Sequence, residues 1–165
     1  MSRIKVFVTG GTFDKNYNYI NGELFFEKTH IPKMLKRAKC RLDVSVEQLM
    51  LIDSLEMNDS QLKIIEEACL KCKSKLIVIT HGTDTMTNTA KFLIKANIQD
   101  KVIVITGAMV PYAFGSSSDG FFNLGSALSV VQTLKKGVYI NMHGQTFNGD
   151  KVEKDIENGI FKSIN

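Results

Sequence analysis

Three short segments of this sequence are almost continuously apolar, and each ends in a threonine that a glycine follows within two residues. These segments are Ile4–Thr9, Leu76–Thr80 and Val102–Thr106. Runs of valine and isoleucine without polar alternation are typical of strands that are buried on both faces. They predict the α/β class, with an open, mostly parallel sheet that carries helices on both faces.

The remaining segments predict the other elements of this sheet. The patterns predict helices at Pro32–Lys39, from Asn58 or Asp59 to about Lys73, at Thr85–Asn97 and at Phe121–Leu134. They predict further strands at Val44–Leu51 and Val138–Met142. Turn residues predict a loop at Ala108–Gly120, a turn at Asn21-Gly22 and a hairpin turn at Asn148-Gly149. With 165 residues, we expect one domain over residues 1–165.

Polar side chains are expected to gather at one edge of the predicted sheet. In open parallel sheets, ligands bind beyond the carboxyl ends of the strands. The segments that follow the strands here are rich in threonine, serine, aspartate and glycine. They are Thr9–Thr12, Asp53-Ser54, Thr80–Thr85 and Thr106–Ala108. The predicted fold and the residue chemistry therefore indicate a site at the same edge.

The glycine-rich turns do not match the common nucleotide or serine-hydrolase motifs. Thr9–Thr12 lacks the G-x-G-x-x-G spacing, and no G-x-x-x-x-G-K-[ST] sequence occurs. Gly115–Gly120 misses the G-x-S-x-G spacing by one residue, and no predicted strand leads directly into it. We interpret Gly115–Gly120 as a flexible loop.

Composition argues against nucleic-acid and membrane partners. The net charge is only +4, and the basic run at residues 33–41 has no interleaved aromatic residues, so it favours a solvated face. No apolar run is long enough to span a bilayer, and the N-terminus leads directly into a strand without a secretory signal. These features predict a soluble, cytoplasmic protein.

The three cysteines, Cys40, Cys69 and Cys72, are expected to be reduced thiols. Cys69-x-x-Cys72 resembles a metal or redox motif, but both residues fall on the apolar face of a predicted helix. No second Cys/His pair stands at zinc-site spacing. We interpret the pair as small core residues.

Two threonines, Thr12 and Thr83, each follow a glycine just past the end of a strand. Glycine lets backbone N–H groups approach a ligand closely, which suits an oxyanion or carboxylate site. A threonine hydroxyl becomes a useful nucleophile only beside a base. Asp84 and a lysine could complete a proton relay with Thr83. The alternative is that both threonines only satisfy backbone groups in turns.

Several motifs occur together in this chain. They are Thr9-Gly10-Gly11-Thr12, His81–Met86, Asp53-Ser54 with Met57–Asp59, Thr106–Met109, Asp119-Gly120 with Phe122–Leu124, and Val152–Lys154. In order and spacing, this set resembles the bacterial-type L-asparaginase and glutaminase family, from about residue 4 to Asn165. The resemblance implies an amidohydrolase with the fold of that family's N-terminal domain.

The resemblance also implies catalytic roles. Thr12 is similar to the family nucleophile, which attacks the side-chain amide carbon of L-asparagine. Thr83, Asp84 and Lys154 resemble a second triad, in which Lys154 draws protons through Thr83. A loop tyrosine assists the nucleophile in this family. Tyr17 is the expected residue because of its short reach from Thr12, and Tyr19 is the competitor.

Substrate contacts follow from the same resemblance. Thr83 and Asp84 would contact the substrate, with Asp84 pairing with the α-amino group. Ser54 and Asp53 would hold the α-carboxylate, and the Ala108 carbonyl would accept a hydrogen bond from the leaving amide. The implied reaction forms an acyl-enzyme, releases ammonia and ends with attack by water. It needs no metal or organic cofactor.

Alternatives remain at this point. The chain could be a glutaminase, the amidase part of an amidotransferase acting on aminoacyl-tRNA, or a binding domain without turnover. His81 is expected to orient its loop, and His30 and His143 match no catalytic position. Phe13 and Asp14 stand where the family more often has a small aliphatic and then a small residue, and Leu55 where some members have a glutamine.

Family members usually continue into a second, smaller domain that completes a neighbour's site. This chain could be a short single-domain member or an excised N-terminal domain. We expect a homo-oligomer, a dimer or tetramer, with the site near a subunit interface. The Leu24-Phe25-Phe26 cluster would be costly to leave in water, and could pack against a partner chain or into its own core.

Overall fold

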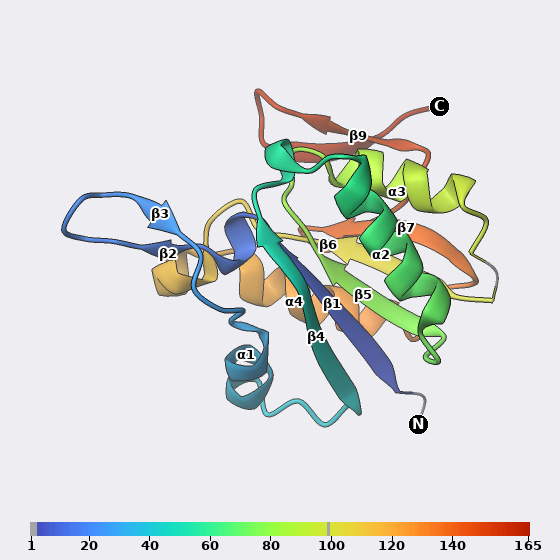
Figure 1. Cartoon of the computed structure of the whole chain (residues 1–165), viewed down its shortest axis with the longest axis horizontal. Helices are drawn as coiled ribbons and strands as arrows, with labels where there is room; N and C mark the ends of the chain where they lie inside the picture. The colour runs from blue at the N-terminus through green and yellow to red at the C-terminus, as the bar shows by residue number, and fades with distance from the viewer. Residues whose placement is uncertain (1–2, 99) are drawn as a thin grey trace.

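A computed structural model describes residues 3–98 and 100–165, which form a six-stranded sheet between two helical layers (Figure 1). The strands of this sheet are β1 (Ile4–Gly10), β4 (Val44–Ile52), β5 (Leu76–Thr80), β6 (Val102–Thr106), β7 (Gly137–Met142) and β8 (Gln145–Asn148). Their spatial order is β4-β1-β5-β6-β7-β8, and all pairs are parallel except β7 with β8. The predicted open, mostly parallel α/β sheet is confirmed.

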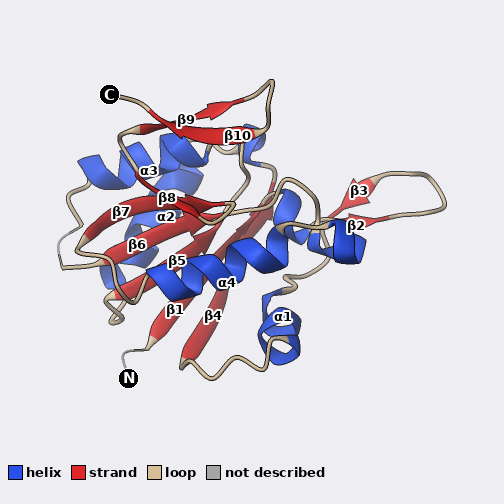
Figure 2. Cartoon of the chain, turned by 180° about the vertical axis from the view of Figure 1, so that it is seen from behind, coloured by secondary structure: helices blue, strands red, loops and turns tan. Residues whose placement is uncertain are grey.

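Alternate residues of each strand supply two hydrophobic cores, one on each face of the sheet. Helices α1 (Ile31–Arg37) and α4 (Gly120–Val130) pack on the face that contains Val6, and helices α2 (Asp59–Lys71) and α3 (Met86–Lys95) on the face that contains Phe7 (Figure 2). Because both faces are covered, the central strands β5 and β6 are apolar up to their final threonine. The uninterrupted pattern in the sequence is thus explained.

The local helix signals are also found in the structure. Helix α2 begins after Asn58, whose side chain accepts a hydrogen bond from the Ser60 N–H while Gln61 closes a capping box. Cys69 is fully buried in the α2–α3 core, and all three cysteines are free thiols. Cys72 lies at the end of the helix and is half-buried.

The Asn148-Gly149 hairpin prediction is wrong. Asn148 does begin a turn, but β8 pairs back with β7 through the turn His143-Gly144, where φ is 52° and 79°. Positive φ at both central residues matches the twist of a two-residue hairpin. After Gly149 the chain leaves the sheet and forms a separate two-stranded ribbon of β9 (Val152–Asp155) and β10 (Ile160–Ser163).

Short elements occupy the segments predicted as loops. The chain after β1 forms a 3-10 turn, η1 (Thr12–Asp14), and then a two-stranded ribbon of β2 (Asn16–Tyr17) and β3 (Leu24–Phe25), with Asn21-Gly22 in the connecting turn. This β2–β3 ribbon stands out from the body of the molecule (Figure 1). Further 3-10 turns are η2 (Ser54–Glu56) and η3 (Tyr112–Ser117), the latter inside the predicted loop 108–120.

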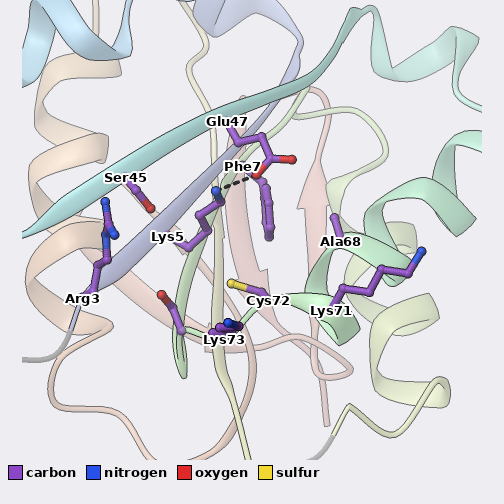
Figure 3. A pocket seen from close by; sticks show the side chains of 10 residues that line it. Arg3, Lys5, Phe7, Ser45, Glu47, Ala68, Lys71, Cys72 and Lys73 are labelled. Atoms are coloured by element: carbon purple, nitrogen blue, oxygen red, sulfur yellow. Dashed lines mark ion pairs between the residues drawn. The ribbon is translucent and has the colours of Figure 1, made fainter.

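The strand order places a topological switch point between β1 and β5. The chain passes from β1 to its neighbour β4 on one side, and from β5 to its neighbour β6 on the other side. The two connections therefore leave the sheet in opposite directions. Ligands of such sheets bind in the crevice at this point. A second groove, of about 410 Å³, lies at the opposite end of the sheet between β1, β4 and the end of α2, where Lys5 pairs with Glu47 (Figure 3).

Candidate active site

Four turns at the carboxyl edge of the sheet touch one another through glycines. A Cβ atom on Gly11 would lie 2.4 Å from the Gly82 Cα, and one on Gly82 would lie 2.4 Å from the Ser54 Oγ. A Cβ on Gly107 would lie 2.4 Å from the His81 carbonyl oxygen. No side chain fits at such distances, so these glycines allow the turns after β1, β4, β5 and β6 to pack directly together.

Thr83, Asp84 and Lys154 form one hydrogen-bonded group. The Lys154 Nζ donates to the Thr83 Oγ1 at 2.8 Å and to the Asp84 Oδ1 at 2.6 Å. Thr83 is buried, and the Lys154 side chain is only 10% exposed, whereas Asp84 is 46% exposed. Strand β9, which lies beside helix α3 (Figure 2), carries Lys154. The three residues expected as a triad are therefore in contact.

Thr12 begins the 3-10 turn η1 and is half-buried. Gly11, with φ of 72°, turns the chain sharply before it and packs on Gly82, the residue before Thr83. In the part of the chain that the structure describes, no side chain hydrogen-bonds the Thr12 hydroxyl. The Thr12 turn thus lies directly against the Thr83 turn, and its hydroxyl is free to meet a ligand.

A lysine from another segment, which sequence reasoning missed, contacts the Asp53-Ser54 turn. The Lys15 Nζ donates to the Asp53 Oδ2 at 2.6 Å, and this hydrogen bond holds the pKa of Asp53 below its ordinary value. Ser54 is buried beside Gly82. Lys15 brings a positive charge to the turn expected to bind a carboxylate. Its position three residues after Thr12 was the only signal in the sequence.

Ala108 is held in a turn that Asp119 and Asn123 fix. The Asp119 carboxylate accepts hydrogen bonds from the Met109 N–H at 3.0 Å and the Val110 N–H at 2.9 Å, and the Asn123 Nδ2 donates to the Gly107 carbonyl at 2.9 Å. Partial burial alone would raise the pKa of Asp119, but the hydrogen bonds from Met109, Val110 and His143 hold it below its ordinary value. The buried Ala108 is therefore rigidly placed.

Two histidines support these turns. His81 is fully buried, and burial lowers its pKa to about 4, so its ring is neutral at pH 7. Its Nδ1 donates to the Gly82 carbonyl and its Nε2 accepts from Thr89, both at 2.8 Å. His143 hydrogen-bonds Asp119 at 2.8 Å. His81 thus orients its own turn, as expected, and His143 has a supporting contact that the sequence did not indicate.

Among the described residues, neither candidate tyrosine forms a hydrogen bond with Thr12. Tyr17 is 51% exposed, and its ring packs edge-on against Phe114 at 5.8 Å between centroids. Tyr19 is 85% exposed. Both residues belong to the protruding segment around the β2–β3 ribbon (Figure 1). The role of a tyrosine beside Thr12 therefore stays a prediction.

Over residues 3–98 and 100–165, no group of three or more His, Cys, Asp or Glu side chains is placed to hold a metal ion. Within the same residues, no helix combines the length and the apolar character needed to cross a bilayer.

Residues 3–164 match the family described as asparaginase, N-terminal. L-asparaginase 2 of Escherichia coli is 33% identical over 178 aligned positions, which cover 100% of this chain and 50% of that protein. A probable periplasmic L-asparaginase of Haemophilus influenzae is 34% identical and covers 93% and 46%. The chain thus spans about half the length of the curated relatives it matches.

Solved structures extend the likeness to the fold. The crystal structure of a probable cytoplasmic L-asparaginase from Campylobacter jejuni superposes with a TM-score of 0.82 at 30% sequence identity. The superposition covers 99% of this chain and 53% of that one. The α/β architecture described above is therefore the architecture of the corresponding half of that protein.

Proposed function

Because the chain belongs to the asparaginase family, through that family's N-terminal domain, we propose that it hydrolyses L-asparagine to L-aspartate and ammonia. One observation carries the proposal: the Lys154 Nζ contacts both the Thr83 hydroxyl and the Asp84 carboxylate beside the Thr12 turn. A half-buried hydroxyl next to a hydrogen-bonded Thr–Lys–Asp group is suited to nucleophilic acyl transfer.

The proposed reaction has two halves. The Thr12 oxygen attacks the side-chain amide carbon, and the Thr83–Lys154 pair relays the hydroxyl proton. The C–N bond then breaks, ammonia leaves with a proton from the relay, and an ester to Thr12 remains. Water attacks this ester, loses a proton to the same relay and releases aspartate and the Thr12 hydroxyl. Atoms and charge balance without a further reactant.

The charges around the site support a zwitterionic amino-acid substrate. Asp84 offers a half-exposed carboxylate for an α-ammonium group, and buried Ser54 offers a hydroxyl for an α-carboxylate. The Lys15 ammonium at Asp53 keeps that turn from repelling an anion. The rigid Ala108 turn supplies a carbonyl that can accept from the amide N–H. We assign these residues to substrate binding on this basis.

Ammonia release by the purified chain is the test of this function. We expect ammonia from L-asparagine, and a lower rate from L-glutamine. Glutaminase activity is the alternative within enzymes, and faster release from glutamine would establish it. Absence of ammonia from both amides, with calorimetric binding of asparagine intact, would instead indicate a domain that binds an amino acid without turnover.

A second copy of the chain is expected to complete the site. Leu24 and Phe25 remain 44% and 42% exposed on the β2–β3 ribbon, next to exposed Tyr17 and Phe114. Exposed apolar side chains clustered in this way are typical of contact surfaces. We therefore propose a homo-oligomer in which this surface meets a partner chain near the site.

Sedimentation equilibrium, combined with the ammonia assay at the same concentrations, tests the oligomer. We expect a dimer or tetramer, and a loss of activity in step with dissociation on dilution. Replacing Phe25 by aspartate should shift the equilibrium toward monomer, whereas replacing exposed Ile156, on the β9–β10 side, should not. A fully active monomer would contradict the proposal.

We also propose a cytoplasmic location. The three cysteines are unpaired thiols, which suits a reducing compartment. The relatives differ, because one is described as cytoplasmic and another as periplasmic. Fractionation of the source cells would decide, and recovery from a secreted or periplasmic fraction would overturn the assignment.

A further inference from the structure

The β2–β3 ribbon is part of segment 15–28. One buried carboxylate links the two ends of this segment. Asp14 lies just before the ribbon, in the same 3-10 turn as Thr12. Its Oδ1 accepts hydrogen bonds from the His30 N–H at 2.8 Å and the Thr29 hydroxyl at 3.1 Å, just after the ribbon and at the start of helix α1. These three residues form the hinge of the ribbon.

The hinge buries polar atoms that have no partner. Asp14 is fully buried, and among residues 3–98 and 100–165 neither its second carboxylate oxygen, Oδ2, nor the buried His30 Nε2 has a hydrogen-bond partner. Leaving such atoms unpaired disfavours the closed hinge, because water would satisfy both when the hinge opens. The closed hinge is therefore a state from which the ribbon can be released.

We propose that Asp14 is a positioning residue whose ionised carboxylate releases the base of the ribbon and whose neutral carboxyl group holds it against helix α1. Ionisation of a carboxyl group in this dry environment favours exposure to water, whereas the neutral form is buried at much lower cost. The carboxyl group thus controls the ribbon from two residues beyond Thr12.

The direction of the pH effect follows from proton affinity. Burial raises the pKa of Asp14 from 3.8 to about 6, more than its hydrogen bonds from His30 and Thr29 lower it. The closed hinge therefore binds the proton roughly 100-fold more tightly than the open hinge, because the two pKa values differ by about two. Closure is favoured at low pH, and this advantage is lost as the pH rises through about 6.

His30, the second titratable residue of the hinge, acts in the opposite sense. Burial lowers the pKa of His30, with Lys33 and Lys28 adding to the effect and Glu27 opposing it. His30 therefore favours opening when it becomes protonated at acidic pH. The Tyr112 ring packs on His30 at 5.4 Å, and Lys15 is engaged by Asp53.

The catalytic part of this inference rests on the proposed function. In the closed hinge, Tyr17 is packed against Phe114 on a ribbon that stands away from the body (Figure 1). Release of the ribbon frees the Tyr17 ring from Phe114, so that it can turn toward Thr12 and assist it. Ionised Asp14 would therefore be the form that permits turnover near neutral pH.

Hydrogen exchange at the His30 amide, followed by NMR, tests the hinge without any substrate. The amide is protected only while Asp14 accepts its hydrogen bond, so its protection reports closure. At about pH 7.5 we expect Asp14→Asn, which mimics the neutral acid, to show protection up to about 100-fold higher than the wild type. At about pH 4.5, where the closed hinge is protonated, the difference should shrink to less than about tenfold. Asp43→Asn, which removes an exposed carboxylate outside the hinge, should match the wild type throughout.

Activity supplies the second readout. We expect the kcat of Asp14→Asn to fall at least tenfold below the wild type at about pH 7.5, and to approach it near pH 4.5. A purely structural defect would lower kcat by a similar factor at both pH values. Equal His30 protection in Asp14→Asn and the wild type at pH 7.5 overturns the hinge proposal, even if ammonia is released. Altered protection in a protein that releases no ammonia refutes only the proposed function.

Discussion

Replacing Thr12 by alanine is expected to lower kcat by roughly a thousand-fold or more, since the group that forms the covalent ester is lost. The side chain is half-buried, and the structure shows no hydrogen bond to its hydroxyl from another described side chain. The fold should therefore survive with a melting temperature close to that of the wild type. Single-turnover ammonia release at saturating asparagine measures the effect.

Two further measurements make this result specific to a nucleophile. Thr12→Ser keeps a hydroxyl at the same place and should retain a substantial part of the rate. Calorimetry should show that Thr12→Ala still binds asparagine, because Ser54 and Asp84 are untouched. Near-wild-type turnover in Thr12→Ala would remove Thr12 from the mechanism.

Replacing Lys154 by methionine is the second change with a large expected effect. Methionine keeps most of the buried stem but removes the Nζ that joins Thr83 to Asp84 at 2.8 and 2.6 Å. Without a proton acceptor behind Thr83, we expect kcat to fall by two to four orders of magnitude, roughly the contribution of general acid–base catalysis. Thr83→Val should have a similar effect, and the double variant should lose little more than either single one.

The neighbouring strand offers a matched control for Lys154. Lys162 on β10 forms ion pairs with Glu153 and Asp155 on the same two-stranded ribbon, outside the site. Lys162→Met should leave kcat unchanged and alter stability only slightly, because exposed ion pairs contribute little. If both lysine variants lost activity equally, disruption of the β9–β10 ribbon, rather than loss of the relay, would be the cause.

Much of the sheet could be predicted because its signals are local. The strand Val102–Thr106 has the predicted bounds, and Asn58 caps helix α2 as its side chain suggests. Glycines after the strands also marked the edge at which the turns meet. These features depend on neighbours within a few residues, so the sequence carries them directly.

The hairpin was misplaced because its signal was not local. Asn148-Gly149 has the preferred hairpin residues, but pairing partners are chosen by burial over the whole sheet. Phe147 packs into the core when β8 folds back on β7, and the turn therefore falls at His143-Gly144. The larger apolar area buried by the β7–β8 pairing outweighs the local preference of Asn148-Gly149 for a hairpin turn.

What the sequence by itself determined is the α/β class, the edge that carries the reactive residues and, through its motifs, the family. What only the tertiary structure decided is which of these residues touch. Lys154 meets Thr83 across 71 positions of the chain, and Lys15 meets Asp53 across 38. The fully buried Asp14 at the hinge of the ribbon is the clearest case. An aspartate in a polar segment is ordinarily solvated, and only the packing of η1 against helix α1 removes its water, which makes its charge a property of the fold.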